Sequence, residues 1–305
     1  MYDCLVVGGG PCGVSASIYL KRAGYNVAVI EKKFIGGQVS ISSSIENYAG
    51  FVDKDAFTFC QNLSKQLKEL LIPVISGEVE EIEEIKDKCF KVKTKKDEHL
   101  AKSVILSIGA ESRKLGLDFE RDYFGRGVSY CAVCDGSFYR KKNVLVIGGG
   151  NSAFEDALYL ANFCSKVYLI NRSEKFRAEQ IYQNKLRSLS IENGGNVEIL
   201  VNATISSLCG KDCVEKAIIS QNGEHKELDV QGVFIAIGRE PKSEFVQNFV
   251  ELQGGYIKVD ANFQTSRKGV FAGGDCILKE LRQVVTAVSD GAYLSKQVSN
   301  FLQHK

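Results

Sequence analysis

The chain has 305 residues, of which 44% are hydrophobic and 25% charged, an ordinary composition for a globular protein. Its formal net charge is +2 and charges of both signs are interspersed, so neither nucleic acid nor an anionic membrane is expected as the main partner. No signal peptide is expected, because the first residues run straight into a strand without a basic region and an apolar region. No apolar run approaches the roughly 18 residues of a spanning helix. We therefore expect a cytoplasmic protein of about two domains.

A Gly-rich loop occurs twice in the chain. The two copies read Gly8-x-Gly10-x-x-Gly13 and Gly148-x-Gly150-x-x-Ala153. A shift of 140 residues keeps them in register, without a gap, through Glu31 and Asn171. Glycines in such a loop permit a tight turn and let the backbone approach a pyrophosphate at the N-terminus of the following helix. We interpret the copies as two mononucleotide-binding βαβ units.

The elements expected around the loops are those of parallel sheets with helices. Continuous apolar runs predict buried parallel strands, and apolar residues at helical spacing predict a helix after each loop, most clearly after the second. In chain order we predict strands over residues 5–7, 27–30, 92–94, 104–109, 144–147, 167–170 and 233–238, short alternating strands between 196 and 237, and a closing helix over 284–302. Residues 111–114 and 239–242 follow matching Ile-Gly dipeptides and are predicted to form two strands of a hinge.

This order predicts an α/β protein with two Rossmann-like nucleotide-binding domains of the three-layer ββα type, one inserted in the other. The outer domain is expected to comprise residues 1–112 and 243–305. The inserted domain is expected to comprise residues 113–242.

The residue that ends each return strand distinguishes the two ligands. Glu31 ends the first strand, where a carboxylate can bond a ribose 2′-hydroxyl and repels a 2′-phosphate, which suits FAD or NAD. Asn171 stands at the equivalent place in the second copy and is followed by Arg172 and Arg177. Loss of the acid and gain of guanidinium groups favours the 2′-phosphate of NADPH. The alternative is that both arginines are solvated surface charges.

Cys131 and Cys134 form a CxxC motif between the two loops. A CxxC suits a redox disulfide or half of a metal site. No second ligand pair accompanies it, because Cys209 and Cys213 are a CxxxC and His99, His225 and His304 are isolated, so we expect no metal. The flanking dinucleotide loops favour a redox disulfide on an electron path from nicotinamide to flavin to disulfide.

Asp135 adjoins the second cysteine of the motif and is the nearest titratable side chain in the sequence. It is our candidate acid/base for protonation of the thiolate. The alternative is a turn residue in an Asp-Gly dipeptide. The other eight cysteines have no disulfide-framework spacing, and most are expected to be small buried hydrophobes.

The chain resembles the low-molecular-weight, bacterial-type thioredoxin reductases, a class of pyridine nucleotide-disulfide oxidoreductases, nearly from end to end. The segments that carry the resemblance are Gly8-Gly9-Gly10-Pro11, Gly36-Gly37-Gln38, Glu46-Asn47-Tyr48-Ala49-Gly50-Phe51, the run from Arg126 to Gly136, Gly148-Gly149-Gly150-Asn151-Ser152-Ala153, Phe176-Arg177-Ala178 and Gly273-Gly274-Asp275. The CAxCDG run and the late GGD are highly specific in combination.

The resemblance implies an FAD-containing homodimer in which NADPH reduces the flavin, the flavin reduces Cys131–Cys134, and the dithiol reduces thioredoxin. It further implies that Cys134 faces the flavin, that Cys131 attacks the partner disulfide, and that the two domains alternate by rotation at the hinge. The FAD residues are then Gly8, Gly10, Pro11, Gly13, Glu31, Gly37, Gln38, Asn47, Gly109, Gly274, Asp275, Arg282 and Gln283. The NADPH residues are Gly148, Gly150, Asn151, Ser152, Ala153, Arg172 and Arg177.

The nucleotide patch departs from the family pattern. The usual His-Arg-Arg-x-x-x-Arg is here Asn171-Arg172-Ser173-x-x-x-Arg177, so one arginine is missing and NADH stays open as a donor. The intact second loop argues against relatives that take electrons from ferredoxin. The acceptor also stays open: a peroxiredoxin, a glutaredoxin-like protein or a small disulfide would use the same chemistry, and a slowly turning-over redox sensor is a different class.

Overall fold

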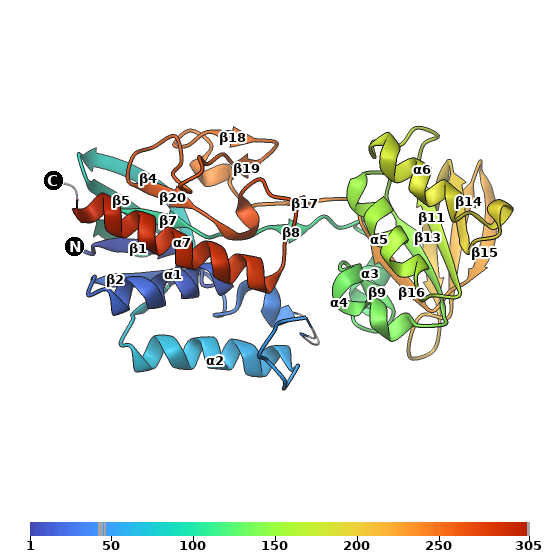
Figure 1. The fold of residues 1–305 in the computed structure, drawn as a ribbon, viewed down its shortest axis with the longest axis horizontal. Coiled ribbons are helices and arrows are strands. Elements are labelled where there is room, and N and C mark those ends of the chain that lie inside the picture. The colour runs from blue at the N-terminus through green and yellow to red at the C-terminus, as the bar shows by residue number, and fades with distance from the viewer. Residues whose placement is uncertain (42–44, 46, 304–305) are drawn as a thin grey trace. The chain divides into compact units, whose positions relative to one another are not determined.

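The structure is a computed structural model that describes residues 1–41, 45 and 47–303. Two of the residues named above, Glu46 and His304, lie outside the described residues. The chain forms two compact units: the first unit is Met1–Glu111 with Glu240–Lys305, and the second unit is Ser112–Arg239. The second unit is thus an insertion in the first (Figure 1).

The first unit is built on a parallel sheet of five strands in the order β20-β7-β1-β2-β3. A three-stranded antiparallel sheet, β4-β5-β6, and the β18-β19 hairpin accompany it. Its elements are β1 (Cys4–Val7), α1 (Pro11–Arg22), β2 (Val27–Glu31), η1 (Gly37–Ile41), α2 (Ala56–Glu69), β3 (Val74–Ser76), β4 (Val79–Lys86), β5 (Cys89–Thr94), β6 (Glu98–Ala101), β7 (Val104–Leu106), η4 (Glu244–Val246), β18 (Leu252–Gln253), β19 (Tyr256–Ile257), β20 (Val270–Ala272), η5 (Gly274–Cys276) and α7 (Val284–Gln303).

The second unit repeats this plan with a parallel sheet in the order β12-β11-β10-β16-β9 and an antiparallel sheet β13-β14-β15. Its elements are α3 (Asp118–Asp122), β9 (Val128–Ser129), α4 (Ala132–Asp135), η2 (Gly136–Tyr139), β10 (Asn143–Ile147), α5 (Asn151–Ala161), β11 (Lys166–Asn171), α6 (Gln180–Ser188), η3 (Ile191–Asn193), β12 (Val197–Val201), β13 (Ala203–Cys209), β14 (Lys216–Gln221), β15 (Glu224–Asp229) and β16 (Gly232–Ile235). The predicted α/β class with two Rossmann-like units is confirmed.

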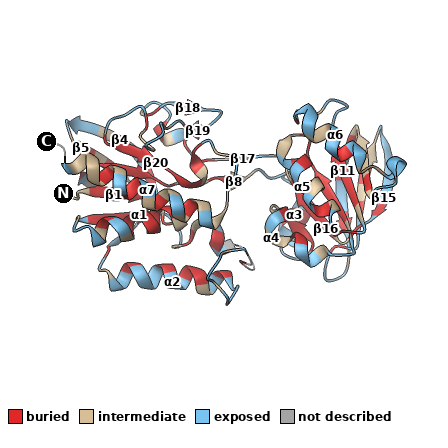
Figure 2. Cartoon of the chain, viewed as in Figure 1, coloured by how far each residue is buried: buried red, intermediate tan, exposed pale blue. Residues whose placement is uncertain are grey.

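Alternation along the buried strands explains the three layers of each unit. In β1, Cys4 and Val6 belong to a core with α1, α2 and α7, whereas Leu5 and Val7 belong to a second core with β4, β5 and β20. The central strand β10 divides its side chains between two cores in the same way. The central strands are buried on both faces, which is why they read as continuous apolar runs (Figure 2).

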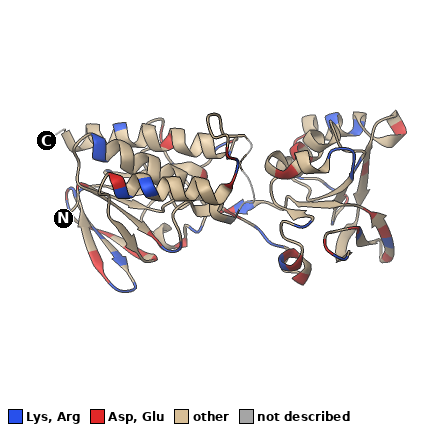
Figure 3. Ribbon diagram, turned by 90° about the horizontal axis from the view of Figure 1, so that it is seen from below, with Lys and Arg blue, Asp and Glu red and all other residues tan. Residues whose placement is uncertain are grey.

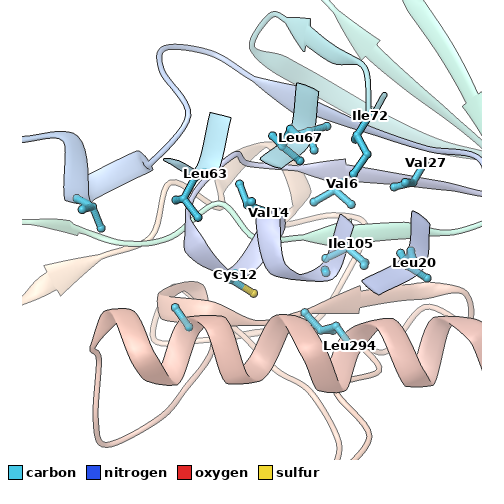
Figure 4. Close-up of a cluster of buried hydrophobic side chains, with 14 of the residues drawn as sticks. Val6, Cys12, Val14, Leu20, Val27, Leu63, Leu67, Ile72, Ile105 and Leu294 are labelled. Atoms are coloured by element: carbon cyan, nitrogen blue, oxygen red, sulfur yellow. The ribbon is translucent and has the colours of Figure 1, made fainter. Parts of the chain in front are cut away.

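Helix packing in the first unit is visible in Figure 4. Leu63 and Leu67 of α2, Val14 of α1 and Leu294 of α7 share one apolar cluster with Val6 of β1. Helix α1 therefore has apolar partners in the sheet and in both other helices. This packing fixes the start of α1, which follows the first Gly-rich loop directly.

Two strands end sooner than the sequence predicts. β7 stops at Leu106 and β16 at Ile235, each three residues before the expected end. Each pairs with a central strand that has itself ended, because Leu106 is opposite Val7 and Ile235 is opposite Ile147. Beyond these residues β7 and β16 have no neighbouring strand on that side to pair with, so the chain leaves the sheet next to the Gly-rich loops.

Two short strands, β8 (Glu111–Ser112) and β17 (Arg239–Glu240), pair with each other where the chain passes between the units. The Arg113 N–H also donates to the Gly238 carbonyl at 3.0 Å. The predicted two-stranded connection is therefore present, but each strand has two residues rather than four.

Basic and acidic residues are distributed over the ribbons of both units (Figure 3). In the described part of the chain, no helix combines the length and the apolar character needed to cross a membrane.

Candidate nucleotide and disulfide sites

The first Gly-rich loop is closed on one side and open on the other. Gly8 has φ +106°, and a Cβ there would lie 2.3 Å from the Ser107 carbonyl oxygen; a Cβ at Gly13 would lie 2.0 Å from the Gly8 oxygen. Gly10 is different, because a Cβ there would meet no heavy atom within 4 Å. The loop is thus packed against the end of β7 and leaves space above Gly10, at the N-terminus of α1.

Glu31 lies at the end of β2 beside this loop, as its place in the sequence requires. The Gly9 N–H donates to its Oε2 at 2.7 Å and the Lys33 N–H to its Oε1 at 2.8 Å. Each carboxylate oxygen keeps a further lone pair for a hydroxyl donor. The side chain therefore orders the loop and can still accept a hydrogen bond from a ribose.

The remaining residues expected at the flavin lie in the first unit, on segments that are far apart in the sequence. The Asn47 Nδ2 donates to the Gln283 Oε1 at 2.9 Å, a contact across 236 residues. A Cβ at Gly37 would lie 3.2 Å from Gly10 Cα, so the start of η1 touches the loop. The others are Pro11 at the start of α1, Gln38 in η1, Gly109 after β7, Gly274 and Asp275 in η5, and Arg282 just before α7.

Arg282 has an unusual environment. Its guanidinium carbon lies 4.6 Å from the centroid of the Tyr256 ring, and its Nη2 donates to the Ile277 carbonyl at 3.4 Å. Its Nε is buried and has no hydrogen-bond partner among the described residues. A buried donor without a partner costs free energy, so this atom is suited to a ligand oxygen.

The second loop has the same construction. A Cβ at Gly148 would lie 2.3 Å from the Ala236 oxygen, whereas one at Gly150 would meet nothing within 4 Å. Helix α5 begins at Asn151 and contains Ser152 and Ala153. The Asn151 side chain exchanges two hydrogen bonds with Glu179, at 2.8 and 2.9 Å, which ties the loop to the start of α6.

Asn171 shapes the segment that carries the two arginines. It is buried, and its Nδ2 donates to the Ser173 and Lys175 carbonyls at 2.7 and 3.1 Å. The Arg177 N–H donates to the Gly149 carbonyl at 2.7 Å, so the segment folds back on the loop. The Asn171 side chain therefore stabilises this turn.

Arg172 and Arg177 are both exposed. Neither guanidinium has a hydrogen-bond or ion-pair partner within the residues the structure describes. Lys175, between them, is also exposed and was not singled out from the sequence. The segment thus presents three cations, none of which forms an ion pair among the described residues.

Cys131 and Cys134 are joined by a disulfide in the second unit, with their Cα atoms 5.3 Å apart. Cys131 precedes the short helix α4, and its Sγ accepts a hydrogen bond from the Cys134 N–H at 3.2 Å. That donor would favour a thiolate at Cys131 after reduction. Of the other cysteines, Cys209 and Cys213 are exposed and the remaining six are buried.

Asp135 is held close to the disulfide by Ser129. The Ser129 Oγ donates to Asp135 Oδ2 at 2.6 Å, and the Cys131 N–H donates to the same Oγ at 3.0 Å. Burial raises the pKa of Asp135, and the hydrogen bond from Ser129 opposes that rise. The carboxyl therefore keeps its proton to a higher pH than an exposed aspartate does.

Replacement of Ser129 by alanine is expected to raise the pKa of Asp135 further, because the one hydrogen bond that stabilises the carboxylate is lost. If Asp135 donates a proton during disulfide exchange, the rate falls as pH rises through its pKa, and S129A moves that fall to higher pH. Single-turnover oxidation of the reduced dithiol, measured against pH, checks this shift. Ser137→Ala, an exposed serine of the same segment, is the control; identical profiles for S129A and wild type would remove Asp135 from the proton transfer.

A buried carboxylate, that of Glu120, lies next to the dithiol segment. The Tyr130 hydroxyl donates to Glu120 Oε2 at 2.6 Å, and the N–H groups of Leu115 and Leu117 donate to the same carboxylate at 2.9 Å each. Glu120 thus links the residue before Cys131 to the chain that enters the second unit. The sequence analysis did not identify Glu120 or Ser129, because no local pattern indicates a contact that forms only in the folded protein. The one signal available was their position close to the CxxC motif.

The geometry defines a protein with two dinucleotide loops and a redox-capable disulfide. The chain matches the family described as pyridine nucleotide-disulphide oxidoreductase over residues 2–291, and it belongs to that family. It is 36% identical to the thioredoxin reductase of Bacillus subtilis (strain 168) over 308 residues, with 99% of this chain and 95% of the relative covered. It is also 36% identical to the thioredoxin reductase of Treponema pallidum (strain Nichols) over 304 residues, covering 99% and 97%.

Among solved structures, the chain is similar to the thioredoxin reductase of Streptococcus pyogenes MGAS5005, with a TM-score of 0.91, 35% identity, and 100% and 99% of the two chains covered. The resemblance stated from the sequence is confirmed by these matches. The protein is an oxidoreductase that acts on disulfides, and its family implies the use of a flavin and a pyridine nucleotide.

Proposed function

We propose that the chain reduces the disulfide of a thioredoxin with electrons from NADPH, with FAD bound by the first unit and NADPH by the second. The observation that carries the proposal is the Cys131–Cys134 disulfide, held beside Asp135 in a unit that also has an open dinucleotide loop. The full-length similarity to thioredoxin reductases supports the choice of acceptor.

The first unit fits FAD on two counts. The space above Gly10 at the N-terminus of α1 suits a pyrophosphate, and the unpartnered Nε of Arg282 suits an acceptor atom of the ligand. We assign FAD binding to the residues Gly8, Gly10, Pro11, Gly13, Glu31, Gly37, Gln38, Asn47, Gly109, Gly274, Asp275, Arg282 and Gln283. When bound, FAD would supply two-electron transfer between the nicotinamide and the disulfide.

The protein groups then carry out disulfide exchange. With the Cys131–Cys134 pair reduced, the Cys131 thiolate attacks one sulfur of the partner disulfide and releases the other as a thiolate. Asp135 is assigned the proton that the released thiolate takes up. Cys134 then attacks the Cys131 sulfur of the mixed disulfide, which re-forms Cys131–Cys134 and releases the second partner sulfur; the proton of the Cys134 thiol ends on that sulfur. Two electrons leave the enzyme and both partner sulfurs end as thiols.

A protein is favoured over a small disulfide as acceptor because apolar side chains are exposed beside the dithiol. Val133, between the two cysteines, is 41% exposed, and Phe138 is 49% exposed. Exposed apolar side chains of this kind suit a protein interface. A peroxiredoxin or a glutaredoxin-like protein would be a second class of acceptor with the same chemistry.

The proposal is tested by steady-state NADPH oxidation with thioredoxin, a glutaredoxin-like protein and glutathione disulfide as alternative acceptors. We expect kcat/KM to be highest for thioredoxin by at least about tenfold, a difference of about 1.4 kcal/mol in transition-state binding. Comparable values for glutathione disulfide would contradict a dedicated protein acceptor. No reduction of any acceptor by a flavin-loaded enzyme would favour a redox sensor.

Nucleotide preference gives a separate prediction. NADPH binding is assigned to Gly148, Gly150, Asn151, Ser152, Ala153, Arg172 and Arg177. Since Ser173 replaces the usual third arginine, NADPH should be favoured over NADH by less than in the usual family member. Each charge-assisted contact to the 2′-phosphate contributes about 1.5–3 kcal/mol, so Arg177→Ala should lower kcat/KM for NADPH about tenfold or more and leave the NADH value nearly unchanged. Arg22→Ala, an exposed cation of the last turn of α1, is the control; equal losses for both nucleotides would refute the assignment.

We also propose a cytoplasmic homodimer. The first unit exposes several large apolar side chains, among them Phe34, Val52, Phe57 and Tyr293, which a second copy could cover. Sedimentation equilibrium tests the assembly state, and a monomer at micromolar concentration would contradict it.

A further inference from the structure

Lys279 and Asp290 form a partly buried ion pair close to the turn expected to contact the flavin. Lys279 Nζ lies 2.6 Å from Asp290 Oδ2, and each side chain is 14% exposed. In every other ion pair found among the described residues, both side chains are more exposed than these two. Even partial burial of two charges costs desolvation free energy, so stability alone does not explain why this pair is present.

The same carboxylate oxygen holds the backbone of the turn. The Gly274 N–H donates to Asp290 Oδ2 at 2.8 Å, and Gly274 has φ +79° at the start of η5. Asp290 lies in α7, whereas Lys279 belongs to the segment between η5 and α7. One oxygen atom therefore connects the helix, that segment and the turn that carries Asp275.

Close packing of α7 on α1 places the carboxylate there. A Cβ at Gly291 would lie 2.2 Å from the Cys12 carbonyl oxygen, and the Ser15 hydroxyl donates to the Val288 carbonyl at 2.8 Å. The turn is packed on the same part of α1, because a Cβ at Gly274 would lie 3.0 Å from Cys12 Cβ. Cys12 follows Pro11 in the first turn of α1, which begins at the open Gly-rich loop.

We infer that Asp290 and Lys279 are positioning residues for the flavin: Asp290 fixes the turn at Gly274 against the start of α1, and Lys279 fixes the carboxylate. The inference rests on the proposed binding of FAD by the first unit. An unclamped turn would free Asp275 and the following segment, which includes Arg282 and Gln283, to leave the positions that a bound flavin requires.

The test is the dissociation constant of FAD for the full-length chain stripped of flavin, measured by fluorescence quenching, together with the Tm of the stripped chain. Asp290→Asn and Lys279→Met should each weaken FAD binding at least about tenfold. Lys279→Arg keeps the charge and should bind FAD within a few-fold of wild type. Lys258→Met breaks an exposed pair with Glu251 in the same unit and should have no effect.

The double variant Lys279→Met with Asp290→Asn separates positioning from simple stability. It removes both charges together, so the Tm should recover toward the wild-type value. FAD affinity should stay reduced, because a neutral amide holds the Gly274 N–H less firmly than a carboxylate. If the double variant recovered FAD affinity together with its Tm, or if the single variants bound FAD as tightly as wild type, the inference would be overturned. The ion pair would then have only a structural role. A wild-type chain that binds no FAD would instead overturn the proposed function.

Discussion

Replacement of Cys134 by serine is expected to lower thioredoxin reduction by about a thousandfold or more, while NADPH still reduces the bound flavin. Without Cys134, no sulfur can close the Cys131–Cys134 bond, so the mixed disulfide with the partner is not resolved and the dithiol cannot be regenerated. Stopped-flow absorbance of the flavin and the rate of thioredoxin reduction measure the two half-reactions separately. Cys209→Ser, which removes an exposed cysteine of the same unit, is the control and should behave as wild type.

The same variant distinguishes the roles of the two sulfurs. C134S should capture a thioredoxin that keeps a single redox cysteine, activated as a mixed disulfide with thionitrobenzoate, as a covalent complex on Cys131. Cys131→Ser should capture little, because the sulfur that accepts the Cys134 N–H is gone. Equal capture by both variants, or more by C131S, would reverse the assigned roles.

Substitution of one open glycine in each loop should remove one ligand at a time. Gly10 and Gly150 have φ −73° and −102°, values that alanine adopts, and a Cβ at either would meet no protein atom within 4 Å. The added methyl group would occupy the space assigned to the pyrophosphate. Gly10→Ala should therefore weaken FAD binding at least tenfold, about 1.4 kcal/mol, with little change in the Tm of the flavin-free chain.

Gly150→Ala is the matched variant in the second unit. It should retain FAD and lose NADPH affinity to a similar extent, as measured by the NADPH concentration dependence of flavin reduction. Gly13→Ala is a contrasting control, because its Cβ would lie 2.0 Å from the Gly8 oxygen and should lower the Tm itself. If G10A binds FAD as wild type does, the ligand does not pass over the first loop.

The sequence predicts the parts of this protein that depend on local sterics. Glycines in register between an apolar strand and an amphipathic helix permit only a few structures, so both loops, their strands and the closing helix could be predicted. Strand ends could not, because β7 and β16 stop where their neighbours stop, which depends on pairing between distant segments. The lengths of β8 and β17 also depend on pairing between distant segments, because these two strands pair with each other.

The contacts that tune the site were also beyond local patterns. Ser129 lies two residues before Cys131, and no local pattern indicates that its hydroxyl joins Asp135 to the Cys131 backbone. Asp290 and Gly274 are 16 residues apart and meet because α7 folds back on α1. The sequence shows that Asn171 replaces the acid of the first copy, but not that its side chain clamps the following turn, because those hydrogen bonds form only in the folded segment.

Anaerobic titration of the FAD-loaded enzyme with NADPH tests the central claim, electron flow from NADPH through FAD to Cys131–Cys134, most directly. Flavin and disulfide are each two-electron couples, so wild type should consume about two equivalents before excess NADPH accumulates, and thiol labelling should then find Cys131 and Cys134 reduced. The double variant Cys131→Ser with Cys134→Ser should consume about one equivalent. A wild-type enzyme whose flavin is fully reduced by one equivalent, with the Cys131–Cys134 disulfide intact at any excess of NADPH, would contradict the account.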